Sequence, residues 1–158
     1  MRLRRFTKFL LFAVVAMMMS LAAGPLIFGQ QVVKTEVLYW HAGSPLRLRV
    51  TWVDNSYSLD LDGKEILTSQ PGDLAGVDEW VRLDPILKVG ENTLTFLGVK
   101  APPPTRDPNS WRFDVLLEST ATGGWSVLKD YSAKNPDYPG TAPSGLQYKL
   151  TVKITVRE

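Results

Sequence analysis

Hydrophobic and polar residues alternate along much of the chain, and this two-residue period is typical of β-strands with one buried face. The clearest run lies near the C-terminus and places six apolar residues at every second position, Leu146, Tyr148, Leu150, Val152, Ile154 and Val156. Comparable alternation predicts four more strands, over residues 46–52, 57–61, 92–99 and 111–118. Weaker signals predict three further strands, over residues 32–40, 80–83 and 125–129.

The spacing of these segments predicts the fold class. After the first 30 residues, no segment keeps a 3.6-residue apolar period over three turns, so helices are not expected there. Pro and Gly separate the strands at intervals of roughly 8 to 12 residues, which is typical of all-β sandwiches and barrels. Two Pro-rich segments, residues 100–110 and 133–145, are expected to form surface loops, because proline cannot pair inside a sheet.

The strands over residues 46–52 and 57–61 are predicted to form a hairpin. If Trp52 and Tyr57 both point inward, directly paired residues have numbers that sum to 109. Arg49 then faces Asp60 on the outer side, and opposite charges at such positions stabilise a sheet by about 0.2 to 1 kcal/mol. In the same register Arg47 faces Asp62.

The acidic residues of this stretch allow a second interpretation. Asp54, Asp60 and Asp62 carry oxygens of the kind that calcium prefers. Calcium loops place more oxygens at tighter spacing and close with a Glu, whereas Leu59 and Leu61 impose a strand period here. Asp62-Gly63 is better explained as a two-residue hairpin turn, because Asp-Gly readily supplies the positive φ angles that such turns require.

Residues 1–29 have the pattern of an export leader. Residues 1–8 carry four positive charges and no acid, and residues 9–28 carry no charge at all. A basic start followed by an apolar run and small residues indicates a signal peptide, and cleavage is expected near Gly29 or, as an alternative, after Ala22. An uncleaved anchor helix remains the other possibility, since about 20 apolar residues span a bilayer. Residues 30–158 are predicted to form one exported domain that is periplasmic, cell-surface or secreted.

The leader also accounts for the basic balance of the whole chain. It holds four of the 18 basic residues and none of the 16 acidic ones, so residues 30–158 carry a net charge of −2. Without a basic patch, nucleic acid is not an expected partner. The chain has no cysteine, which excludes thiol catalysis, disulfides and cysteine-ligated zinc. The domain must therefore be stabilised by its core, as its size allows.

Three segments share one pattern of strands and turns, and together they cover about residues 46–118: LRLRVTWVDNSYSLDLDGKEI, EWVRLDPILKVGENTLTF and WRFDVLLE. They resemble galactose-binding-domain-like β-sandwiches, the jelly-roll modules common in exported and carbohydrate-active proteins. The family's turn and strand positions are occupied by Asp54-Asn55, Tyr57, Asp62-Gly63 and residues 87–94. The resemblance implies a single antiparallel β-sandwich of jelly-roll type. It also suggests carbohydrate as the ligand class.

Two residues of the last element have a structural explanation that needs no ligand. Gly90 suits a turn with positive φ, and the Asn92 side chain is expected to bond nearby backbone where the next strand begins.

Catalysis is not expected. His41 is the only histidine, and Ser44 lies three residues away. A nucleophile and base also need an orienting acid and oxyanion donors, and no motif supplies them. Asp114 and Glu118 share one strand face, but charged residues on the wet face of a sheet are the ordinary finding. We therefore expect no enzyme activity and no cofactor.

Aromatic residues near turns and loops are the candidate binding residues. Four of them meet this description, Trp80, Trp125, Tyr131 and Tyr138. Exposed rings of this kind can stack on sugars, with polar neighbours such as Asp78, Asn135 and Asp137 setting the orientation. The alternative is that these rings only cover the open ends of the sandwich.

The sequence thus predicts an exported, non-catalytic β-sandwich that acts as a binding or accessory module, with a glycan as its expected partner. The alternative function is a structural subunit of an envelope or cell-surface assembly, with another envelope protein as the partner. In that hypothesis the last strand, residues 146–156, pairs edge to edge with a neighbour, although its Lys and Arg residues oppose such pairing. Contact with a membrane is expected only through an uncleaved leader.

Overall fold

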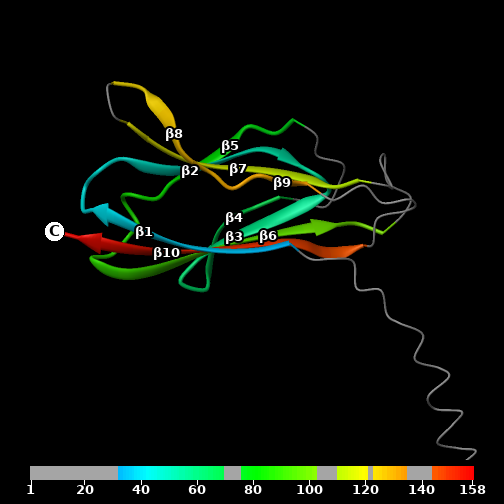
Figure 1. Ribbon diagram of the computed structural model, residues 1–158, viewed down its shortest axis with the longest axis horizontal. Helices are drawn as coiled ribbons and strands as arrows, with labels where there is room; N and C mark the ends of the chain where they lie inside the picture. Colours follow the sequence, from blue (N-terminus) through cyan, green and yellow to red (C-terminus); the bar gives the residue numbers. More distant parts are fainter. Residues whose placement is uncertain (1–31, 70–75, 103–109, 121–122, 135–143) are drawn as a thin grey trace, which may run out of the picture.

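The computed structural model describes residues 32–69, 76–102, 110–120, 123–134 and 144–158. Every regular element in these ranges is a strand, and the strands form two sheets that face each other (Figure 1). The predicted all-β class is therefore confirmed, with two sheets as in a β-sandwich. Within the described ranges, no helical segment has the length and hydropathy of a membrane span. The predicted leader, residues 1–29, lies outside them.

Sheet A contains five strands. Their order across the sheet is β1 (Val32–His41), β10 (Gly145–Arg157), β6 (Gly90–Lys100), β3 (Ser56–Leu61) and β4 (Lys64–Thr68). The expectation of a purely antiparallel sandwich is wrong at one pair, because β1 runs parallel to β10. The last strand is also not an edge, since β1 and β6 bond to its two sides. Edge-to-edge pairing through β10 is therefore excluded.

Sheet B is built around β2 and β7. Its order is β5 (Glu79–Arg82), β2 (Leu46–Val53), β7 (Arg112–Thr120) and β8 (Trp125–Asp130), and the short β9 (Ala133–Lys134) pairs with the other end of β7. All eight predicted strand segments thus correspond to observed strands. The structure adds β4 and β9 to them.

The core lies between the sheets and is centred on aromatic rings. The ring centroid of Phe96 in β6 lies 5.4 Å from that of Tyr57, 5.9 Å from Tyr148 and 6.1 Å from Phe113. A Cβ atom at Gly98 would lie 2.8 Å from the Phe113 ring. Glycine at this position therefore lets the ring pack directly against the β6 backbone.

The predicted hairpin between β2 and β3 is not formed. The alternation is as expected, since Val50 and Leu59 are both fully buried. However, β2 belongs to sheet B and β3 to sheet A, so the two strands face each other across the core. Arg49 therefore does not face Asp60, whose cross-strand partners are Glu65 and Thr95.

Asn55 explains the crossing between sheets. Its backbone has a φ of 84°, which turns the chain sharply between Val53 and Tyr57. The Asn55 side chain is buried, and its Oδ1 accepts a hydrogen bond of 2.7 Å from the N–H of Ala101. A turn anchored to the end of β6 in this way directs β3 into sheet A beside β6.

Trp52 does not point inward as expected. The register of β2 against β7 shifts between Val50 and Trp52, and Trp52 then pairs with Asp114 on the outer face. Such a bulge places an extra residue in one strand and reverses the direction of the side chains that follow. The guanidinium carbon of Arg112 lies 5.2 Å from the centroid of the Trp52 ring.

The two predicted turns are confirmed. Asp62 and Gly63 have φ angles of 51° and 78° and join β3 to β4. Gly90 has a φ of 100°. The Asn92 Oδ1 accepts a 2.9 Å bond from the Lys88 N–H, and its Nδ2 donates to the Lys88 carbonyl at 2.8 Å.

Candidate functional site

The outer face of sheet B brings together two tryptophans that are far apart in sequence. Trp80 of β5 is the cross-strand partner of Arg49, and Trp125 of β8 is the partner of Thr120 in β7. Arg49 alternates with buried residues, and Thr120 has the same parity as Glu118, whose partner is Arg47, so both indole rings lie on the solvent side of the sheet. Trp80 is 53% exposed, while Trp125 is half-buried.

Arg47 of β2 lies close to both rings. Its guanidinium carbon is 5.4 Å from the Trp80 ring centroid and 4.4 Å from the Trp125 centroid. Arg82 of β5 is also near Trp125, at 5.2 Å. Cations at these distances are attracted to indole faces by about 0.5 to 1 kcal/mol at exposed sites. The contacts favour the observed positions of the two rings on the sheet.

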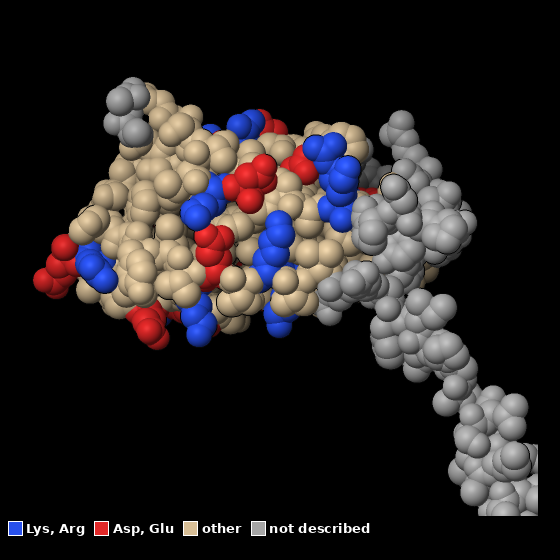
Figure 2. Space-filling model, in the orientation of Figure 1, with Lys and Arg blue, Asp and Glu red and all other residues tan. Residues whose placement is uncertain are grey.

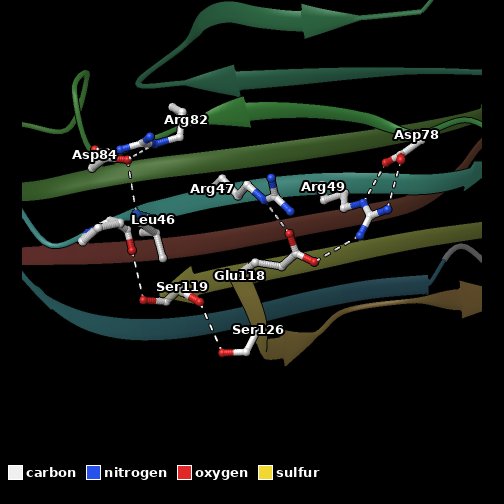
Figure 3. Close-up of polar contacts among 10 residues, drawn as sticks. Leu46, Arg47, Arg49, Asp78, Arg82, Asp84, Glu118, Ser119 and Ser126 are labelled. Carbon is white, nitrogen blue, oxygen red and sulfur yellow. Dashed lines mark hydrogen bonds and ion pairs between the residues drawn. The ribbon is translucent and has the colours of Figure 1, made fainter. Parts of the chain in front are cut away.

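Glu118 of β7 anchors this arrangement from below. Its side chain is almost completely buried, and its Oε2 lies 2.5 Å from the Nε of Arg47 (Figure 3). Its Oε1 lies 3.5 Å from an Arg49 terminal nitrogen. Burying a carboxylate is unfavourable unless it is paired and hydrogen-bonded. We call the surface formed by Trp80, Trp125, Arg47, Arg49 and Glu118 the tryptophan–arginine face.

Two further ion pairs border the tryptophan–arginine face. Arg49 contacts Asp78 through two bonds of 2.7 and 3.0 Å, and this contact lowers the pKa of Asp78. Arg82 binds Asp84, whose pKa is also lowered, and the Asp84 Oδ1 accepts a 3.2 Å bond from the Leu46 N–H (Figure 3). Both carboxylates therefore remain charged near neutral pH.

Basic and acidic side chains lie interspersed on the face shown in Figure 2. On and beside the tryptophan–arginine face, the guanidinium groups of Arg47, Arg49 and Arg82 are each paired with a carboxylate. The site therefore presents apolar rings and hydrogen-bonding groups rather than a strong field of one sign.

The other candidate aromatic residues fall elsewhere. Tyr131 is 3% exposed and belongs to the core, so the expected exposed ring is not found there. Burial, with a contribution from the nearby Glu36, raises the Tyr131 pKa to about 12. The Tyr148 hydroxyl donates to the Tyr131 carbonyl. Tyr138, Asn135 and Asp137 lie outside the described residues.

The candidate calcium ligands are not brought together. Asp62 lies in the β3–β4 turn, where its Oδ1 accepts a 2.8 Å bond from the Thr93 N–H. Asp54 lies at the opposite end of β3, with its Oδ2 3.5 Å from the Lys100 Nζ. Asp60 is on the outer face between them. In the part of the chain that the structure describes, no three His, Cys, Asp or Glu residues are grouped to hold a metal ion.

His41 is an exposed residue at the end of β1. It lines a small pocket together with Ser44 and Asp84. Asp84 is already bound to Arg82 and to the Leu46 N–H, and the Ser44 N–H bonds to the His41 carbonyl at 3.1 Å. The contacts of Ser44 and Asp84 therefore have structural roles.

Sequence reasoning selected both tryptophans but missed the residues that hold them. It paired Arg47 and Arg49 with Asp62 and Asp60, whereas the structure pairs them with Glu118 and Asp78. Glu118 was grouped with ordinary surface acids. One feature of the sequence pointed to Glu118. It is a charged residue on the outer side of a strand whose neighbouring residues are mostly buried, and such a charge needs a partner.

Comparisons with protein-family models, with curated proteins and with solved structures found no match to this chain.

Proposed function

We propose that this protein is an exported, non-catalytic binding module that recognises carbohydrate through the tryptophan–arginine face. We further propose that its sandwich is of the galactose-binding-like jelly-roll type. The observation that carries the functional proposal is the exposed Trp80 ring beside Trp125, with the Arg47 guanidinium in contact with both. A sugar presents a flat apolar face and a rim of hydroxyls, and this surface offers partners for both.

The polar groups beside Trp80 suit hydroxyl recognition. Asp78 is well exposed, and its carboxylate oxygens keep lone pairs beyond those used by Arg49. A sugar stacked on the Trp80 ring would place its rim hydroxyls toward these oxygens. Because Arg47, Arg49 and Arg82 are each paired with a carboxylate, the surface favours a neutral sugar over a strongly acidic one.

The tryptophan–arginine face is held together by contacts within the protein. The bonds from Glu118 and Asp78 fix the two arginines, and the arginine contacts fix the rings. A site that is already ordered loses less conformational entropy on binding, which favours affinity.

We also propose that the protein is not an enzyme, because the acidic residues on and beside this face are engaged in ion pairs. Glu118, Asp78 and Asp84 are each bound to an arginine. The ion pairs lower the pKa of Asp78 and of Asp84, so these two carboxyl groups are poor proton donors near neutral pH. Export is supported by the leader pattern of residues 1–29.

A glycan array and a polysaccharide pull-down with the exported protein test the proposal. We expect retention on at least one neutral glycan. Trp80→Ala removes the exposed stacking ring and should abolish retention, and Trp125→Ala should weaken it. Retention on no glycan, or unchanged retention in Trp80→Ala, contradicts the proposal.

Tyr39→Ala is the matched control. Tyr39 is 62% exposed and has the Arg157 guanidinium 4.9 Å from its ring centroid, but it lies on sheet A. This variant should bind glycans as the unmodified protein does. Thermal unfolding of all three variants checks that loss of binding does not reflect loss of the fold.

A further inference from the structure

The edge of sheet A formed by β1 is free in the part of the chain that the structure describes. β1 pairs with β10 on one side only, and it does so over ten residues without a register shift. An edge strand of this length exposes a row of backbone N–H and C=O groups that can pair with another strand.

The other described edges carry features that oppose pairing. β4 has five residues and a register shift, β5 has four residues, and β8 has six residues and a register shift. Short length and bulges are the usual protections of sheet edges. β1 has neither.

The outward side chains in the first half of β1 carry no ionisable group and are largely apolar. Val33 is 58% exposed and Val37 is 53% exposed. Thr35 lies between them on the same face, and it is also exposed. An exposed, long and apolar edge is a surface that favours strand pairing.

The inward side chains include one basic and one acidic residue, and both are bonded within the molecule. The Lys34 Nζ donates to the Ser132 carbonyl at 2.9 Å. The Glu36 Oε1 accepts from the Lys129 Nζ at 2.7 Å. Because the ammonium of Lys34 and the carboxylate of Glu36 already have hydrogen-bond partners, a strand that packs beside β1 does not have to bury an unsatisfied charged group.

We propose that β1 pairs antiparallel with β1 of a second copy of this chain, about a two-fold axis at Thr35. In this register Val33 faces Val37 of the second copy on the outer side. Lys34 faces Glu36 of the second copy on the inner side. Apolar and opposite-charge pairs at directly opposed positions both stabilise a sheet.

The charges select this register over its neighbours. A two-fold axis at Lys34 places two lysines opposite each other, and an axis at Glu36 places two glutamates opposite each other. Like charges at such positions are destabilising. The axis at Thr35 avoids both and joins the two copies of sheet A into one continuous sheet.

The absence of native cysteine makes a disulfide test direct. The full chain carrying Thr35→Cys is expressed with its leader, and cells are treated with a copper–phenanthroline oxidant before non-reducing electrophoresis. We expect Thr35→Cys to form a covalent dimer, because the two-fold axis brings this position next to itself. The control is Thr93→Cys, which is exposed on the outer face of β6 inside sheet A and should stay monomeric.

The register is tested by two further variants. Val33→Cys and Val37→Cys should each cross-link poorly alone and efficiently when the two chains are co-expressed. A second substitution, Val37→Lys in the Thr35→Cys chain, should cause loss of the dimer, because each copy then brings a charge to the apolar seam. The proposal is overturned if Thr35→Cys cross-links no more than Thr93→Cys, or if Val37→Lys leaves the dimer intact.

Discussion

The guanidinium carbon of Arg47 lies 4.4 Å from the centroid of the Trp125 ring, although the two residues are 78 positions apart in the sequence. Register explains the contact. Arg47 pairs with Glu118 of β7, and Glu118 pairs with Val127 of β8. Three neighbouring strands therefore place Arg47, Glu118 and Trp125 on one face, with the carboxylate beneath the guanidinium.

Glu118→Gln should destabilise the protein markedly. The substitution removes the charge that pairs with Arg47, and breaking a buried ion pair lowers the free energy of unfolding by about 3 kcal/mol. Asp114→Asn is the control, because Asp114 binds the well-exposed Arg112 and exposed pairs contribute about 0 to 1 kcal/mol. Urea unfolding of both variants measures the difference. Equal effects would show that Glu118 does not anchor the tryptophan–arginine face.

Gly98→Ala should also destabilise the fold. The added Cβ meets the Phe113 ring at 2.8 Å, and overpacking of this kind lowers the free energy of unfolding by about 1 to 3 kcal/mol. Gly124→Ala, where a Cβ meets no atom within 4 Å, should have little effect. Combining Gly98→Ala with Phe113→Leu should recover part of the loss in a double-mutant cycle. No recovery would mean that the Phe113 ring is not the obstacle.

Asn55 offers a test of the crossing between the sheets. Asn55→Gly keeps the positive φ but leaves the Ala101 N–H without its 2.7 Å bond from this side chain. Asn55→Ala loses the bond and also strains the backbone, so it should be less stable than Asn55→Gly by about 1 kcal/mol. Chemical denaturation measures both. Equal stability of the two variants would contradict the assigned backbone conformation.

Much of the fold follows from the sequence, because side-chain alternation is local. The alternation of apolar residues gives the buried face of β3, of β2 as far as Val50, and of β10 from Tyr148 onward, and the Asp62-Gly63 turn follows from its residue types. The alternation fails at Leu146, which is 39% exposed, because the register of β10 shifts between Leu146 and Tyr148. Which strands pair with each other, in contrast, depends on residues that are far apart in the sequence. The hairpin prediction failed because a short link between two strands fits both a hairpin and a crossing between sheets.

The candidate site was predictable only in part, because its residue types are visible in the sequence whereas their proximity depends on strand pairing. Trp80 and Trp125 stand out as aromatic residues near turns. Their proximity depends on the order of β5, β2, β7 and β8, which alternation does not determine. The bulge that turns Trp52 outward is a further non-local feature, since it appears only in the pairing with β7.

Alkaline pH should unfold the protein cooperatively with tyrosine ionisation. Burial raises the pKa of Tyr57, Tyr131 and Tyr148, and that of Tyr131 moves from 10.0 to about 12. A raised folded-state pKa stabilises the fold fully below the unfolded value, and this contribution is lost as pH rises through the folded value. Circular dichroism and phenolate absorbance should therefore change together above pH 10. Ionisation of all the tyrosines near 10 with the fold intact would contradict their burial.

The central claim, that Trp80 and Trp125 form one carbohydrate-binding surface, is tested most directly by NMR. The indole N–H signals of the five tryptophans are followed while the protein is titrated with the glycan retained in the pull-down. The account predicts that the Trp80 and Trp125 signals shift along one common saturation curve, while that of the fully buried Trp111 stays in place. Saturable binding that leaves the Trp80 and Trp125 signals unmoved would contradict it.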